Sequence, residues 1–162
     1  MKFKNSLLVV KDIEKSKKFY KEVLDLDVMM DFGANVTLTG GIALQSEDSW
    51  KQFIHKDIHF CGNDTELYFE ENHFDDFIKK LNSIENMNYV HSVKEHSWGQ
   101  RVIRFYDLDH HIIEVGENME IVCQRFLDSG MTIKQVAKKM DVPIGFVTDI
   151  AVCRREKEKY VC

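Results

Sequence analysis

The order strand, helix, strand, strand, strand occurs twice in the first 117 residues, and this repeat restricts the possible folds more than any other feature. In the first copy, residues 5–10 (NSLLVV) have strand character and Asp12 is a suitable helix N-cap. Apolar residues then recur at helical spacing from Ile13 to Leu24. Three short strand-like segments complete this copy, at residues 26–32, 36–39 and 42–45.

The second copy begins with a predicted strand at residues 66–70, after a connection at 47–63 that has no clear period. Asn72 is predicted to cap a helix that runs to about Ser83. Three more strands are predicted, at residues 89–96, 100–107 and 111–116. Either copy alone would form a small sheet with one helix, which is too little to bury an apolar face of that sheet. The expected fold is therefore α+β, with paired βαβββ modules (about 3–46 and 64–117) forming a curved, largely antiparallel sheet around a cleft.

Composition narrows the class of protein. Hydrophobic residues make up 44% and charged residues 30% of the chain, which is typical of a soluble globular protein. No apolar run approaches the roughly 20 residues of a membrane span, and the N-terminus lacks the features of a signal peptide. A cytoplasmic location is expected, because the four cysteines are scattered without a CxxC pair, at Cys61, Cys123, Cys153 and Cys162.

Residues 119–162 are predicted to be a helical extension of a domain at 1–118. Helical segments are expected at 120–128 and 133–140, with a third starting at Pro143. The run SGMTIKQVAKKMDVPIGFVTDI is similar to a helix-turn-helix, but no Lys or Arg follows Pro143 until Arg154. Residues 1–118 carry 14 Lys and Arg against 21 Asp and Glu. Nucleic-acid binding is therefore not expected, and an appendage that packs against the domain or a dimer partner is favoured.

The stretch FYDLDHHIIEVGE (105–117) indicates strand, acidic turn, strand, with one carboxylate, Glu114, inside the apolar second strand. Such a carboxylate either faces solvent on the wet side of a sheet or belongs to a functional site. The local sequence leaves both interpretations open.

Residues 7–26 (LLVVKDIEKSKKFYKEVLDL), residues 98–117 (WGQRVIRFYDLDHHIIEVGE) and the paired module order resemble the vicinal-oxygen-chelate superfamily, which includes glyoxalases, bleomycin-resistance proteins and ring-cleaving dioxygenases. The resemblance covers about residues 3–117. The closing hairpin of the family usually has Asp-Pro-Asp-Gly at its turn, where this chain has Leu108 and His110 in place of Pro and Gly. The resemblance implies the fold but not the reaction, because this fold hosts lyases, isomerases, dioxygenases and plain binding proteins.

The resemblance also implies where a metal would be held. Its four ligand positions fall on Asn5, Ala43, Glu66 and Glu114. Ala43 has no donor atom and Asn5 is a poor ligand for a transition metal. No cofactor is therefore expected; if a divalent metal is present, Glu66 and Glu114 are its expected ligands. These two carboxylates are also the candidate catalytic pair, since two close carboxyl groups can divide acid and base roles.

Strand alternation supplies candidate ligand-binding residues around that pair. In 100–107, either Arg101, Ile103 and Phe105 face the cleft, or Val102, Arg104 and Tyr106 do, and the second pattern is preferred. The predicted binding residues are Asn5, Tyr68, Trp98, Arg104 and Tyr106. Aromatic rings with carboxylates and one arginine suit a cationic or polyhydroxy aromatic molecule. The alternative is that these residues form the wet face of the sheet.

Three functions follow. The first is a metal-free protein that binds a small molecule, of the bleomycin-resistance kind. The second is an enzyme, of glyoxalase-like lyase or isomerase type or of dioxygenase type with a divalent metal. The third is a ligand-responsive regulator that acts through the C-terminal helices. The resemblance further implies a homodimer.

Overall fold

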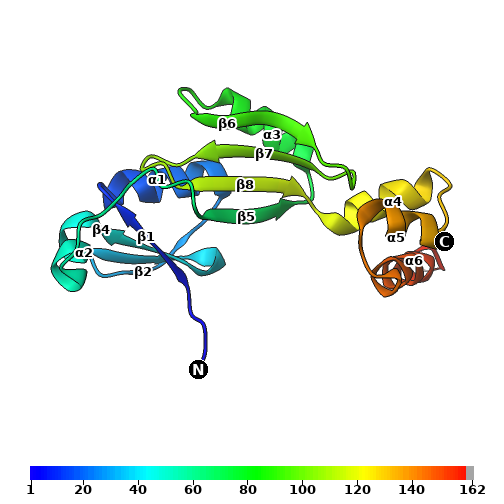
Figure 1. Ribbon diagram of the computed structural model, residues 1–162, viewed down its shortest axis with the longest axis horizontal. Coiled ribbons are helices and arrows are strands. Elements are labelled where there is room, and N and C mark those ends of the chain that lie inside the picture. The colour runs from blue at the N-terminus through cyan, green and yellow to red at the C-terminus, as the bar shows by residue number, and fades with distance from the viewer. Residues whose placement is uncertain (160–162) are drawn as a thin grey trace. The chain divides into compact units, whose positions relative to one another are not determined.

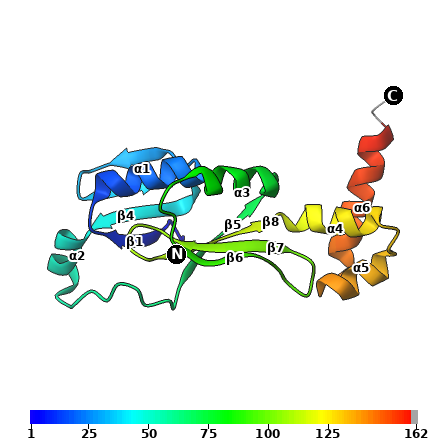
Figure 2. The same ribbon diagram turned by 90° about the horizontal axis from the view of Figure 1, so that it is seen from above.

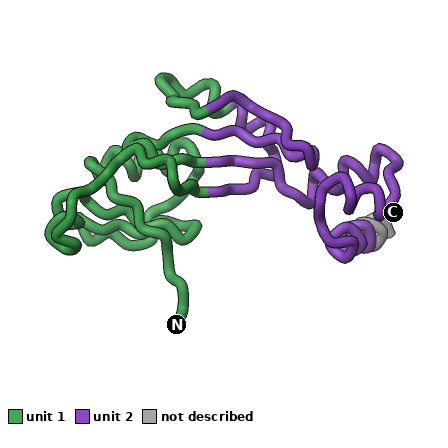
Figure 3. Tube along the Cα trace, viewed as in Figure 1, with its two compact units in different colours: residues 1–67, 80–90, 105–113 green, residues 68–79, 91–104, 114–162 purple. Residues whose placement is uncertain are grey.

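The computed structural model describes the backbone of residues 1–159 and the side chains of residues 1–153. The side chains from Arg154 on, including that of Cys162, lie outside this range. The chain forms two compact units (Figure 3). Unit 1 comprises residues 1–67, 80–90 and 105–113, and unit 2 comprises residues 68–79, 91–104 and 114 onward. The predicted domain boundary at residue 118 stays a prediction.

The repeated order of elements and the α+β class are confirmed (Figures 1 and 2). The first module consists of β1 (Ser6–Val10), α1 (Ile13–Leu24), β2 (Val28–Asp31), β3 (Asn35–Leu38), a 3-10 turn (Thr39–Gly41) and β4 (Ile42–Ser46). After α2 (Glu47–Ile54), the second module consists of β5 (Glu66–Glu71), α3 (Phe74–Ser83), β6 (Tyr89–Glu95), β7 (Arg101–Tyr106) and β8 (Ile112–Glu117). The strand orders are β1-β4-β3-β2 and β5-β8-β7-β6.

The first sheet is covered by α1. β1 and β4 run parallel with Leu7 opposite Ala43, and the other pairs of this sheet are antiparallel. The predicted N-cap is confirmed, because the Asp12 carboxylate accepts a hydrogen bond from the Lys15 amide at 3.0 Å. The helix buries Tyr20 on the sheet side, and the alternate residues of β1, β3 and β4 that are also buried include Val10, Val36, Leu38, Ile42 and Leu44.

Two local predictions were wrong. Residues 47–54 form the helix α2 rather than irregular connection. The helix has only eight residues, which is shorter than the window over which hydrophobic periodicity identifies a helix. Asn72 does not cap α3, which begins at Phe74. The Glu71 carboxylate accepts a hydrogen bond from the His73 amide at 2.7 Å, and the helix begins one residue later than an Asn72 cap would place it.

The acidic turn between β7 and β8 is held by one buried carboxylate in unit 1. Asp107 accepts hydrogen bonds from the Tyr20 hydroxyl at 2.7 Å and from the amides of Asp109 and His111 at 2.9 and 2.8 Å. The His111 ring nitrogen Nδ1 lies 2.8 Å from the same carboxylate. His110 adopts φ 67°, the left-handed conformation that the usual glycine of this turn would adopt freely.

Replacing Asp107 with Asn is expected to lower the free energy of unfolding at pH 7 by about 2 kcal/mol, because charge-assisted hydrogen bonds are lost. Burial alone would raise the pKa of Asp107, but His111 and Tyr20 outweigh it and leave this pKa below its ordinary value of 3.8. The stabilisation is therefore present above about pH 4 and is lost as pH falls through the folded-state pKa. Urea unfolding at pH 3–7 should show a shallower loss of stability with acid in the variant.

Asp109→Asn is the matched control. Burial, together with the charge of Asp107, raises the pKa of Asp109 although the Lys11 amide donates to it, so the fold disfavours its charged form. Removing this charge should leave stability at pH 7 unchanged or slightly increased. A loss in Asp109→Asn as large as that in Asp107→Asn would contradict the account.

The C-terminal extension is three helices with a core of their own in unit 2. They are α4 (Met119–Asp128), α5 (Ile133–Met140) and α6 (Ile144–Lys159). Their buried cluster consists of Val122, Cys123, Val136, Ala137, Met140 and Val147. The Thr132 side chain caps α5 in a capping box with Gln135. No helix in the described part of the chain is long and apolar enough to cross a membrane.

Candidate functional site

Two contacts in unit 2 identify which face of the second sheet is covered by α3. The Arg101 guanidinium lies 5.2 Å from the ring centre of Phe74 on α3, and it also contacts Glu117 of β8 at 2.7 Å. Because side chains alternate along a strand, Arg104 on β7 and Glu114 on β8 lie on the opposite face, which we call the open face because α3 does not cover it. Arg104 therefore lies away from α3, in agreement with the preferred alternation, and its facing a ligand cleft stays a prediction.

An ion pair occupies the centre of this open face. The Arg104 guanidinium contacts the Glu114 carboxylate directly. The Glu114 side chain is only 7% exposed, so its charge is compensated within the protein rather than by water. Nε2 of His91, on β6, lies 3.3 Å from Nη1 of Arg104 on the other side of the guanidinium. The Glu114 carboxylate is thus bound by Arg104, and Arg104 in turn contacts His91.

A hydrogen-bonded group of rings and amides continues along the same face. The Gln100 amide nitrogen donates to the Tyr68 hydroxyl at 2.8 Å, and this hydroxyl donates to Glu70 at 3.0 Å. The indole of Trp98 donates to the Gln100 amide oxygen at 3.2 Å and stacks on His96, with ring centres 4.1 Å apart. We call Tyr68, Glu70, Trp98, Gln100, Arg104 and Glu114 the open-face cluster.

The cluster keeps Tyr68 neutral. Burial and the nearby Glu70 carboxylate, opposed by the hydrogen bond from Gln100, together raise the pKa of Tyr68 to about 12. The phenol is therefore a hydrogen-bonding group and not a base at neutral pH. Its ring is 47% exposed, so a flat ligand can stack on it.

The predicted site residues fall into both units. Tyr68, Trp98, Arg104 and Glu114 are brought together in unit 2, as described above. Asn5, Glu66 and Tyr106 belong to unit 1. There, Asn5 is half-buried before β1 and Glu66 is exposed at the start of β5. The Tyr106 hydroxyl donates to the Asn63 side chain at 2.9 Å. The pairing of Glu66 with Glu114 stays a prediction, as do the roles of all these residues.

Gln100 is the cluster member that sequence reasoning missed. It is 4% exposed, and its amide nitrogen also donates to the Glu117 carbonyl at 2.8 Å. A Cβ atom on Gly116 would lie 2.7 Å from that nitrogen, so the glycine admits the glutamine. The only available signal was the glycine within an apolar strand, which often marks a close approach.

The donor set does not fit a metal. Among the described residues, no group of three or more His, Cys, Asp or Glu side chains could hold an ion. Of the positions that the family resemblance implies, Ala43 is buried and lacks a donor, and Glu114 is engaged by Arg104. A metal at Glu114 would have to displace that arginine.

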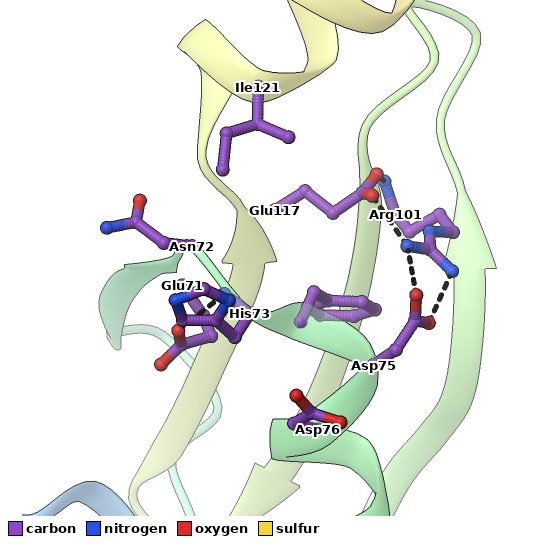
Figure 4. A pocket seen from close by; sticks show the side chains of 9 residues that line it. Glu71, Asn72, His73, Asp75, Asp76, Arg101, Glu117 and Ile121 are labelled. Atoms are coloured by element: carbon purple, nitrogen blue, oxygen red, sulfur yellow. Dashed lines mark hydrogen bonds and ion pairs between the residues drawn. The ribbon is translucent and has the colours of Figure 1, made fainter.

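A separate cavity of about 250 Å³ opens on the α3 side of the same sheet (Figure 4). It is lined by Glu71, Asn72, His73, Phe74, Asp75, Asp76, Arg101, Glu117 and Ile121. Its carboxylates already have partners, since Arg101 bridges Asp75 and Glu117 and Lys79 contacts Asp76. Burial would raise the pKa of Glu117, but hydrogen bonds from Arg101 and Arg125 outweigh it and lower that pKa. The charged residues that line this cavity are therefore better explained as a structural ion-pair network than as a binding site.

Comparisons with known proteins agree with this fold. The model of the glyoxalase-like domain family matches residues 3–120. A crystal structure of a protein of unknown function from Agrobacterium tumefaciens str. C58 is 34% identical, with a TM-score of 0.66, covering 74% of this chain and 95% of that one. The comparison with curated proteins finds no match.

Two more distant structures show the fold alone. Lactoylglutathione lyase from Agrobacterium tumefaciens is 18% identical, with a TM-score of 0.57, covering 70% of this chain and 91% of that one. A glyoxalase/bleomycin resistance protein/dioxygenase family enzyme from Burkholderia phytofirmans PsJN is 12% identical, with a TM-score of 0.60, covering 72% of this chain and 98% of that one.

Proposed function

Because this chain belongs to the glyoxalase-like domain family of the vicinal-oxygen-chelate superfamily, we propose that it binds a small aromatic molecule at the open-face cluster without a resident metal. The single observation that carries the proposal is the ion pair of Arg104 and Glu114. Glu114 is at the position where the resemblance implies a metal ligand, and the arginine supplies the positive charge that a metal would otherwise supply.

The chemistry of the cluster supports a cationic or polyhydroxy aromatic ligand. The exposed ring of Tyr68 and the stacked pair of Trp98 and His96 offer aromatic surfaces. Glu70 is exposed and offers a carboxylate to a cation or to ligand hydroxyls. Gln100 is satisfied on both ends of its amide, so it fixes the neighbouring rings rather than reaching for a ligand.

The other two functions gain less support. An enzyme of lyase, isomerase or dioxygenase type needs a metal or a carboxylate that is free to take a proton, and Arg104 stabilises the charged form of Glu114. A regulator that binds DNA through α6 needs basic residues near the start of that helix, and residues 144–153 contain none.

Calorimetric titration with a planar aromatic cation, proflavine, and a polyhydroxy aromatic compound, quercetin, tests the proposed ligand class. We expect at least one to bind, and we expect Tyr68→Phe to weaken binding about tenfold by removing a hydroxyl that orients Glu70. Tyr89→Phe is the matched control, because this tyrosine is similarly exposed and its hydroxyl contacts Leu81 and Asn82 instead.

Tryptophan fluorescence locates the binding site. The chain has two tryptophans, so Trp50→Phe leaves Trp98 as the only reporter. Ligand binding should change Trp98 emission in this background. The proposal would be contradicted if neither probe nor a wider set of cationic and polyhydroxy aromatic compounds binds, or if binding leaves Trp98 emission unchanged.

We also propose a homodimer, supported by an apolar outer strand in unit 1. β2 is at the edge of its sheet, and its residues Val28, Met29 and Met30, with Phe32 directly after the strand, are 44–71% exposed. An edge strand can pair with its own copy around a two-fold axis. Met30→Lys should shift the mass measured by light scattering from dimer towards monomer, while Val152→Lys, on exposed α6, should not. A monomeric wild-type protein would contradict the proposal.

A cytoplasmic location is a further part of the proposal. Cys61, Cys123 and Cys153, the described cysteines, are free thiols. Free thiols are typical of a reducing compartment. Fractionation of cells that produce the tagged protein should recover it with cytoplasmic markers, and recovery with secreted proteins would contradict this.

A further inference from the structure

The first helix of the C-terminal extension packs onto the turn that carries Trp98. Nη2 of Arg125 on α4 donates to the carbonyl of Gly99 at 2.5 Å. The ring of Phe126 lies so close to Gly99 that a Cβ atom there would be 2.3 Å from the Phe126 Cζ atom. Gly99 is buried and lies between Trp98 and Gln100, which both belong to the open-face cluster. Side chains of the extension therefore contact the backbone of the turn that joins Trp98 to Gln100.

A second connection runs through the end of β8. Nη1 of Arg125 donates to both carboxylate oxygens of Glu117, at 2.8 and 3.1 Å. The carbonyl of the same glutamate accepts the amide hydrogen bond of Gln100. Arg125 thus contacts the Gly99 carbonyl in the turn before Gln100 and the side chain of Glu117, whose carbonyl binds the Gln100 amide.

The extension has a buried core of its own. Its buried cluster consists only of residues from α4, α5 and α6. Glu117 would still accept hydrogen bonds from the Arg101 side chain and amide, at 2.7 and 3.0 Å. The contacts that join α4 to the turn at Gly99 are thus one arginine hydrogen bond and one aromatic contact, and an interface this small is one that binding elsewhere can bias.

We propose that Arg125 and Phe126 are positioning residues, and that docking of α4 sets the affinity of the open-face cluster for its ligand. This inference rests on the proposed function. Coupling between binding sites is reciprocal, so ligand binding must strengthen the docking of α4 to the same extent. A partner that binds the extension and draws α4 away would release the ligand.

Arg125→Gln in the full chain tests the positioning without any ligand. In the Trp50→Phe background, we expect the constant for acrylamide quenching of Trp98 to rise about twofold, because the turn opens locally. Lys138→Gln, at an exposed position on α5, should leave it unchanged. Arg125→Lys keeps the charge but loses the fork, so it should give an intermediate value. Quenching in Arg125→Gln equal to that of the control would overturn the inference.

Binding of proflavine or quercetin, whichever binds in the titration above, tests the coupling. Affinity should fall by about 5- to 50-fold in Arg125→Gln, and the ligand should slow hydrogen exchange at residues 119–128 of the wild-type chain. Unchanged affinity in Arg125→Gln would overturn the coupling while leaving the proposed function intact. Absence of binding in the wild type would overturn the proposed function and with it the coupling, whereas the quenching result would still decide whether Arg125 positions Trp98.

Discussion

Replacing Arg104 with Met should lower the free energy of unfolding by about 3 kcal/mol, the usual effect of removing one partner of a buried ion pair. The Glu114 side chain is 7% exposed, so little water can replace the lost guanidinium. Because methionine keeps most of the packing volume of arginine, the decrease in the free energy of unfolding would mainly measure the effect of the lost charge. Urea unfolding followed by circular dichroism measures this change.

The double variant Arg104→Met, Glu114→Met separates charge from packing. It should recover most of the stability lost in the single variant, because an apolar pair no longer leaves a buried charge alone. Lys94→Met is the control, since Lys94 is an exposed cation on β6 and its loss should change stability by less than about 0.5 kcal/mol. A double variant that is less stable than Arg104→Met would show that the ion pair does not have the role assigned to it.

Gly99→Ala should lower the free energy of unfolding by about 3 kcal/mol or more, through two separate effects. Gly99 has φ +90°, where an alanine is strained by about 1–2 kcal/mol. The new Cβ atom would also meet the Phe126 ring at 2.3 Å, so α4 would have to move. Thermal or urea unfolding of the full chain gives the total effect.

Gly130→Ala is a matched control for the first effect alone. Gly130 has a similar φ of +88°, and nothing lies within 4 Å of an added Cβ atom. Gly130→Ala should lose only the stability that corresponds to the strained backbone. The difference in the free energy of unfolding between the two variants then measures the contact with Phe126. Adding Phe126→Ala to Gly99→Ala should remove the overlap and make the two substitutions non-additive. Equal losses at Gly99 and Gly130 would mean that the turn and α4 are not in contact.

The sequence predicted the order of elements well because hydrophobic periodicity and capping residues are local signals. The repeated module order and the Asp12 cap follow from such signals. The face of β7 that carries Arg104 follows from strand alternation together with the apolar character of Ile103 and Phe105. The partner of Arg104 could not be predicted in the same way. Whether it meets Glu114 depends on the register between β7 and β8, which the sequence does not specify.

The structural role of Gln100 was beyond sequence reasoning for a similar reason. Its hydrogen bonds connect Tyr68, Trp98 and the Glu117 carbonyl, which come from three separate segments. Likewise, the extension was recognised as helical, but its contact with Gly99 depends on side chains of α4 that point to a distant turn. Such contacts between segments are set by tertiary packing and leave little trace in local composition.

Metal content is the measurement that tests the central claim most directly, namely that Arg104 and not a metal ion neutralises Glu114. The protein should be purified without chelator, and Zn, Ni, Fe and Mn should be quantified by plasma mass spectrometry. We expect less than about 0.1 metal ion per chain in the wild type, since no competent donor set is present. About one ion per chain, lost on Glu114→Ala, would contradict the account.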